Sequence, residues 1–158
     1  MAKGGIVSAI HQGSLAEELE LVPGDKIISI NEQELTDIID LSFALADEEI
    51  EMLIEHENGE QEIIAFEKDI DEELGAEFES AVFGKIRQCA NNCYFCFVDQ
   101  VAPNMRDSLY IKDDDYRLSF LYGNFVTMTN MGPRDLERIH RLHLSPLYIS
   151  VHTTNPKL

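Results

Sequence analysis

The three cysteines of the chain lie within eight residues, Cys89-Ala90-Asn91-Asn92-Cys93-Tyr94-Phe95-Cys96. Their spacing is C-x3-C-x2-C, and an odd number of cysteines cannot pair internally as disulfides. Three thiolates on one short loop can hold three corners of a cubane iron–sulfur cluster and leave the fourth iron open. Open coordination positions are where metal sites carry out chemistry. The spacing therefore predicts a cluster site with Cys89, Cys93 and Cys96 as the metal ligands.

Two other interpretations of these cysteines stay open. In a helix, positions 89, 93 and 96 would share one apolar face and act as ordinary core, although the neighbouring Asn91 and Asn92 favour turns. A zinc site would need a fourth ligand, and no further Cys or His lies at the usual partner spacing. His140 and His143 are distant in the sequence.

An aromatic residue, Phe95, directly precedes the third cysteine, and the next two residues are apolar. With these features the segment resembles the radical S-adenosylmethionine (radical SAM) enzymes, whose motif is CxxxCxxC with an aromatic before the third cysteine. The resemblance implies a [4Fe–4S] cluster whose open iron binds SAM, and cleavage of SAM to a 5′-deoxyadenosyl radical in an oxidoreductase-type reaction. It also implies an electron donor such as a flavodoxin or ferredoxin, and it places Phe95 over the cluster and beside the adenine of SAM.

The charge is unevenly distributed along the chain. The formal net charge of the chain is −18. Residues 1–80 have a net charge of −20, whereas residues 81–158 have a net charge of +2. We therefore expect an N-terminal domain over residues 1–70, a linker over 71–80 and a second domain over 81–158. The acidic half argues against nucleic acid as a partner, because its surface would repel phosphates. No apolar run is long enough for a membrane span or a signal peptide, so we expect a cytoplasmic protein.

Residues 1–70 carry clear local signals. Strands are expected at residues 5–10 and 26–30, and a capping box of Ser14 and Glu17 opens a short helix over residues 15–19. Asp37 can cap a second helix. Asn58-Gly59 predicts a hairpin between strands 51–55 and 62–66.

This order of elements, with Gly13-Ser14-Leu15-Ala16 and the run from Leu21 to Asn31, resembles a PDZ domain, an α+β fold. PDZ domains bind the C-terminus of a peptide by strand addition. The chain begins at about the strand that follows the family's binding loop. Peptide binding and an intramolecular or scaffolding contact are therefore both open.

Residues 81–158 read as alternating strands and helices, which is typical of α/β folds with a parallel sheet. Strands are expected at 81–88, 125–129 and 147–152, and a helix from Pro133 is expected to bury Leu136, Ile139 and Leu142. The run 113–115 is expected to be a solvated turn of three aspartates. With the cysteine loop directly after the first strand, the order is similar to the first units of a partial (β/α) radical SAM barrel, apparently truncated.

The same resemblance suggests further cofactor contacts. Radical SAM proteins carry a glycine-rich element at the second strand that binds the amino end of SAM, and Gly123 with Asn124 could fill this role. His152 ends the third strand, at the rim where barrel active sites lie. The expected cofactor-binding residues are Phe95, Gly123, Asn124 and His152.

Almost all of the chain resembles the N-terminal part of the uncharacterised bacterial radical SAM proteins that have a PDZ domain and a C-terminal region called DUF512. That resemblance implies a radical SAM enzyme acting on an unknown substrate as a longer protein, with these 158 residues expected to be a fragment. Two rival functions stay open. One is a non-enzymatic iron–sulfur or zinc protein, and the other is a PDZ-type interaction module with an inactive C-terminal part.

Overall fold

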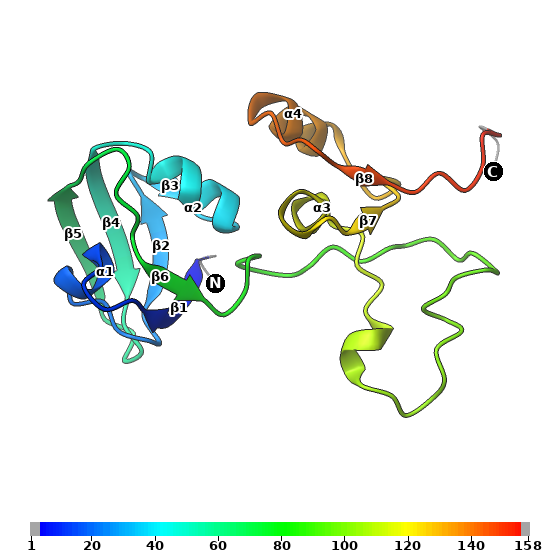
Figure 1. The fold of residues 1–158 in the computed structure, drawn as a ribbon, viewed down its shortest axis with the longest axis horizontal. Helices are drawn as coiled ribbons and strands as arrows, with labels where there is room; N and C mark the ends of the chain where they lie inside the picture. The colour runs from blue at the N-terminus through cyan, green and yellow to red at the C-terminus, as the bar shows by residue number, and fades with distance from the viewer. Residues whose placement is uncertain (1–3, 156–158) are drawn as a thin grey trace. The chain divides into compact units, whose positions relative to one another are not determined.

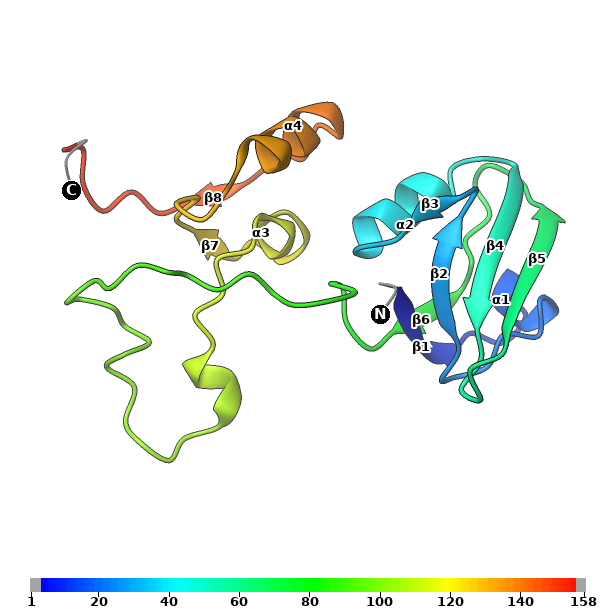
Figure 2. The same ribbon diagram turned by 180° about the vertical axis from the view of Figure 1, so that it is seen from behind.

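The computed structural model describes residues 4–155 of the chain. The chain forms two compact units, one ending at Lys85 and the other beginning at Ile86 (Figures 1 and 2). The two units are called unit 1 and unit 2 below.

Unit 1 is an antiparallel sheet with two short helices. The strand order is β5-β4-β2-β1-β6, and the short strand β3 also pairs with β2. The elements are β1 (Gly5–Ile10), α1 (Leu15–Glu18), β2 (Lys26–Ile30), β3 (Gln33–Glu34), α2 (Ile38–Ala44), β4 (Glu49–Glu55), β5 (Gln61–Glu67) and β6 (Ala76–Phe78).

The local signals of this half are confirmed. The strands at 5–10 and 26–30 and the hairpin around Asn58-Gly59 form as expected. Ser14 accepts a hydrogen bond from the Glu17 N–H at the start of α1, while the Glu17 carboxylate accepts one from the Gly13 N–H. Asp37 caps α2 by accepting from the N–H groups of Ile39 and Asp40. Each helix therefore begins where a side chain satisfies its first unpaired N–H groups.

The core of unit 1 lies on one face of the sheet. Along β4 the side chains alternate, with Ile50, Met52 and Ile54 buried and Glu49 and Glu51 exposed. This period of two is what a strand with one solvated face requires. Glu49 and Glu51 thus occupy outer positions of β4, where water solvates their charges.

The end of unit 1 differs from expectation. Residues 71–80, expected as a linker, include β6, which pairs with β1. The expected strand over 81–88 was wrong: among the described residues this segment makes only isolated bridges, at Val82 and Gln88. At the Val82 bridge, which pairs with Asp37, the Ala81 carbonyl accepts from the Ile38 N–H and the Phe83 N–H donates to the Thr36 carbonyl.

His56 joins the β4–β5 hairpin to the turn before β2. Its Nδ1 lies 2.9 Å from Oδ1 of the buried Asp25, and its Nε2 lies 3.4 Å from Glu62 Oε2. The hydrogen bond with Asp25, followed by that with Glu62, raises the pKa of His56 above 6.5. The protonated imidazole therefore contributes to the stability of unit 1.

We expect that contribution to be complete below pH 6.5 and to be lost as the pH rises through the raised pKa of the folded state. Thermal unfolding across neutral pH should show the wild type losing more stability with rising pH than His56→Gln does. His11→Gln is the matched control, because His11 Nε2 also lies 3.1 Å from a carboxylate, that of Glu77, but at an exposed site. Parallel profiles for the wild type and His56→Gln would contradict this account.

Unit 2 contains little regular structure. Its elements are the 3-10 turn η1 (Asp107–Tyr110), α3 (Tyr116–Tyr122), β7 (Phe125–Val126), α4 (Pro133–Arg141) and β8 (Tyr148–Ile149). Strands β7 and β8 pair in parallel, with Phe125 opposite Tyr148 and Val126 opposite Ile149. The expected parallel pairing of the strands before and after α4 is therefore confirmed, but over two residues only. No barrel forms within residues 4–155.

Helix α4 begins at Pro133 as expected, but its expected buried face is wrong. Leu136 is 52% exposed, and Ile139 and Leu142 are only partly covered. A pair of two-residue strands offers too little surface to bury a helical stripe. Within the part of the chain that the structure describes, no helix is long and apolar enough to cross a membrane.

Candidate cofactor site

The three cysteines lie on an irregular loop of unit 2. The loop consists of coil and turn, and the Cys96 N–H donates to the Cys93 carbonyl at 3.0 Å. All three cysteines are free thiols of intermediate exposure. The helical interpretation is thereby excluded, because the segment has no helical turn that would align positions 89, 93 and 96.

The start of the loop is tied to residues 112–114. The Cys89 N–H donates to the Lys112 carbonyl at 2.8 Å, and the Asp114 N–H donates to the Arg87 carbonyl at 2.9 Å. Gln88 and Asp113 form an antiparallel bridge between the same two segments. The residues that lead into Cys89 are thus held by a short irregular ladder rather than by a strand.

An ion pair joins the far side of the loop to the same segment. Lys112 Nζ lies 2.6 Å from the carboxylate of Asp99, three residues beyond Cys96. The hydrogen bond to Asp99 raises the pKa of Lys112, and the charges of Asp99, Cys96 and Cys89 add to the effect. The hydrogen bond to Lys112 lowers the pKa of Asp99, with a smaller contribution from a hydrogen bond to Cys96. One ammonium group therefore lies within electrostatic range of two of the three sulfurs, those of Cys89 and Cys96.

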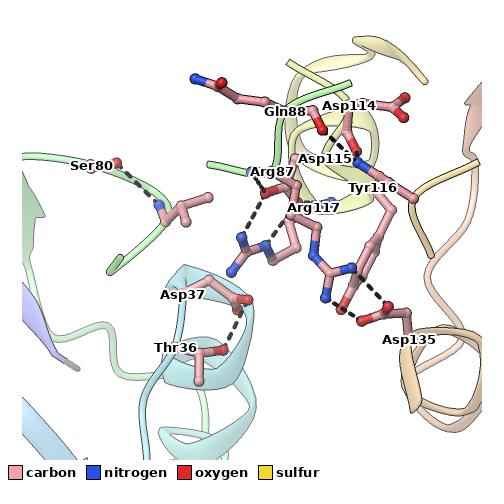
Figure 3. Close-up of polar contacts among 12 residues, drawn as sticks. Thr36, Asp37, Ser80, Arg87, Gln88, Asp114, Asp115, Tyr116, Arg117 and Asp135 are labelled. Carbon is pink, nitrogen blue, oxygen red and sulfur yellow. Dashed lines mark hydrogen bonds and ion pairs between the residues drawn. The ribbon is translucent and has the colours of Figure 1, made fainter. Parts of the chain in front are cut away.

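Charged side chains, some of them buried, hold the segment on both sides of this ladder (Figure 3). The Arg87 guanidinium binds the Asp135 carboxylate through both terminal nitrogens, and its backbone N–H donates to Asp115 at 3.0 Å. Asp115 is fully buried and also accepts from the N–H and the guanidinium of Arg117. Burial alone would raise the pKa of Asp115, but the bonds from Arg117 and Arg87 outweigh it and lower the pKa.

The expected solvated turn at 113–115 was therefore wrong. Asp114 is 2% exposed and Asp115 is 0% exposed. Each has several donors in contact, so both carboxylates stay satisfied away from water. The sequence predicted a surface feature at these three adjacent aspartates because their partners lie 11 or more residues away or in the following helix.

Two of the expected cofactor residues lie together. The Phe95 ring is 5.2 Å from the His152 ring in an edge-on arrangement, and Tyr94 packs on Phe95 at 5.0 Å. Phe95 is 43% exposed, and His152 is exposed as well. The loop between the second and third cysteines thus contacts the segment that follows β8.

Gly123 and Asn124 have local contacts. Gly123 ends α3 in the left-handed conformation, with a φ of 77°, and its N–H donates to the Ser119 carbonyl. Asn124 donates to the Asp113 carboxylate at 2.7 Å. Both residues precede β7, so they lie at its N-terminal end, whereas ligands of parallel sheets bind at the C-terminal ends of strands.

The residues that follow β7 contact the cysteine loop instead. Asn91 donates to Thr129 at 2.7 Å, and Asn130 donates to the Gln88 carbonyl at 3.1 Å. The sequence analysis predicted neither the contact of Asn91 with Thr129 nor that of Asn130 with Gln88. Polar side chains directly after a β-branched strand were the signal that could have found them.

The donor chemistry of the loop fits an iron–sulfur cluster, because one short loop carries three free thiols and two of them lie near the Lys112 ammonium. In this structure the three sulfurs do not lie close enough together to bind one metal centre. No group of three His, Cys, Asp or Glu side chains within residues 4–155 lies close enough to hold one metal ion. Binding would therefore require the loop to adjust.

Comparison with known protein families finds two domains in succession, with a boundary that lies inside unit 1 rather than at its end. A PDZ domain model matches residues 6–56, and a model of a radical SAM-like domain matches residues 68–158. A comparison with curated proteins finds no match. Since the second model covers more than half of the 158 residues, the chain belongs to the radical SAM-like family and carries a PDZ domain ahead of that family's domain.

Proposed function

We propose that Cys89, Cys93 and Cys96 hold a [4Fe–4S] cluster and that the chain binds SAM at the iron that lacks a protein ligand. The observation that carries the proposal is that all three free thiols lie on one non-helical loop within the matched radical SAM-like domain. When bound and reduced, the cluster supplies the electron that cleaves SAM into methionine and a 5′-deoxyadenosyl radical.

The residues around the loop have distinct tasks in this proposal. Lys112 offsets negative charge near Cys89 and Cys96, since its ammonium lies within electrostatic range of both. Phe95, packed on His152, offers a flat surface for the adenine of SAM. An electron donor such as a flavodoxin or ferredoxin is the partner that the reaction requires.

Cleavage of SAM tests the proposal. The 158-residue chain is loaded anaerobically with iron and sulfide, reduced, and incubated with SAM, and the products are separated by chromatography. We expect 5′-deoxyadenosine and methionine in equal amounts, only after loading and only with reductant. Intact SAM after incubation with fully loaded, reduced protein would count against the proposal.

The PDZ domain suggests peptide binding as a second function. PDZ domains take peptides by strand addition at a sheet edge, and here β6 already pairs with β1. We propose that this intramolecular contact fills the β1 edge. Titration with peptides that end in a free carboxylate tests this proposal. Saturable binding would contradict the proposal that β6 occupies the β1 edge, and absence of binding would support it.

A further inference from the structure

A row of polar side chains connects the cysteine loop to the residues that follow β7. We infer that Asn91, Thr129, Thr127 and Asp114 form a hydrogen-bonded relay that positions the cysteine loop for its ligand. They are positioning residues, because none of them is a proposed cluster ligand. The inference rests on the proposed function, and it adds four residues to the three cysteines.

The contacts of the relay follow one after another. Asn91 Nδ2 donates to Thr129 Oγ1 at 2.7 Å, and the hydroxyls of Thr129 and Thr127 are 2.8 Å apart. Thr127 Oγ1 then lies 2.7 Å from Asp114 Oδ2, and the Thr127 N–H donates to Asp114 Oδ1 at 2.5 Å. No gap in this series exceeds hydrogen-bond distance.

The direction of these hydrogen bonds is fixed by chemistry. An ionised carboxylate can only accept, so the Thr127 hydroxyl donates to Asp114. Having used its one proton, Thr127 Oγ1 must accept from the Thr129 hydroxyl. Thr129 Oγ1 in turn accepts from the Asn91 amide, which can donate. All three side-chain donors therefore point toward the carboxylate of Asp114, and each has an acceptor.

The end of the relay at Asp114 is firmly anchored. Asp114 is 2% exposed, and its backbone N–H donates to the Arg87 carbonyl at 2.9 Å. Asn130 Nδ2 donates both to the Asp114 carbonyl and to the Gln88 carbonyl, at 3.0 and 3.1 Å. The anchor is thus joined to the residues directly before Cys89.

The other end of the relay lies inside the loop. Asn91 stands between Cys89 and Cys93, 38 residues from its partner Thr129. The backbone bond of Cys89 to Lys112 fixes where the loop starts, and the relay fixes its interior. Holding an irregular loop in place reduces the conformational freedom that ligand binding must otherwise remove.

Two variants cut the relay at different points in the full 158-residue chain. Thr127→Val keeps the β-branched shape and removes the central hydroxyl, and Asn91→Ala removes the donor in the loop. Asn92→Ala is the matched control, because it makes the same change at the next position, where the side chain is exposed. Exchange of the α3 amides of Ser119 and Gly123 reports whether each variant is folded.

The first readout needs no metal. In the apo chain, hydrogen exchange of the peptide containing the Cys89 and Cys96 amides, both hydrogen-bonded, should become about five times faster in Thr127→Val and in Asn91→Ala, since about one hydrogen bond of stabilisation is lost. The double variant should be no faster than the more affected single variant, because both changes break the same series of bonds. Asn92→Ala should match the wild type.

The second readout is the rate at which the loaded chain loses iron to a chelator, which should rise by a similar factor in the two relay variants. Unchanged loop exchange in both variants would overturn the inference, as would faster exchange without faster iron loss. A wild-type chain that binds no iron would overturn the proposed function alone, and loop exchange would still decide whether the relay holds the loop.

Discussion

Replacing Cys93 by alanine is expected to abolish cluster assembly in the reconstituted chain. A [4Fe–4S] cluster held by three thiolates has one iron without a protein ligand, and loss of a second ligand leaves half of its irons unsupported. The neighbours of Cys93 on the loop, Asn92 and Tyr94, carry no thiol that could replace it. Iron and sulfide bound per chain should fall by more than about tenfold, to the background of adventitious metal.

Cys89→Ala and Cys96→Ala should have the same result, because all three sulfurs are free thiols on one loop. Asn92→Ala, on the same loop, should load like the wild type. Analysis of zinc alongside iron separates the rival metal site, since a zinc protein would lose zinc rather than iron. A full complement of iron and sulfide in Cys93→Ala would contradict the ligand assignment.

Asp115→Ala is expected to destabilise unit 2 by about 3–5 kcal/mol, the usual cost of breaking a buried ion pair by removing one partner. Asp115 is fully buried, and Arg117 binds it through Nε at 2.8 Å and through a terminal nitrogen at 2.6 Å. The substitution leaves the Arg117 guanidinium without this carboxylate and removes the side chain that accepts from the backbone N–H groups of Arg87 and Arg117.

Hydrogen exchange of the α3 amides measures this loss in unit 2 alone. Asp107→Ala is the control, because Asp107 is an exposed aspartate of the same unit. The lowered pKa of Asp115 also sets a pH dependence: its contribution is present above pH 3.8 and is lost as the pH falls through the folded-state pKa. Exchange in Asp115→Ala equal to that in Asp107→Ala would refute a stabilising role for this carboxylate.

The parts of the fold that the sequence predicted are those with local causes. Ser14 and Asp37 cap helices through N–H groups two or three residues away, and Asn58-Gly59 closes a hairpin within a few residues. Such contacts involve neighbouring residues, so the order of side chains is enough to predict them. The alternation along β4 is equally local, because it follows from the geometry of a single strand.

The parts that failed depend on partners far along the chain. Val82 and Gln88 each make a bridge, but the backbone between them bonds to residues around 36 and 115, which no local pattern indicates. The burial of Asp114 depends in the same way on Thr127. Three consecutive acidic residues usually mark a solvated surface, and only the contacts of unit 2 reverse that expectation.

In the candidate site, too, the sequence predicted the local features and missed most contacts between residues far apart in the chain. The spacing of the cysteines indicates a cluster from the sequence alone, because it depends on eight consecutive residues. The contact of Phe95 with His152 and that of Asn91 with Thr129 join residues 57 and 38 positions apart. His152 was expected at the site from its place after a strand, whereas Thr127 and Thr129 were regarded only as strand residues.

The most direct test of the central claim is the electron paramagnetic resonance spectrum of the loaded, reduced chain, recorded with and without SAM. A cluster bound by Cys89, Cys93 and Cys96 has one iron free to take SAM, so we expect a [4Fe–4S] signal whose g-values shift when SAM is added. A signal that SAM leaves unchanged, or no cluster signal at all in a chain that is folded, would contradict the claim that these three cysteines form a radical SAM site.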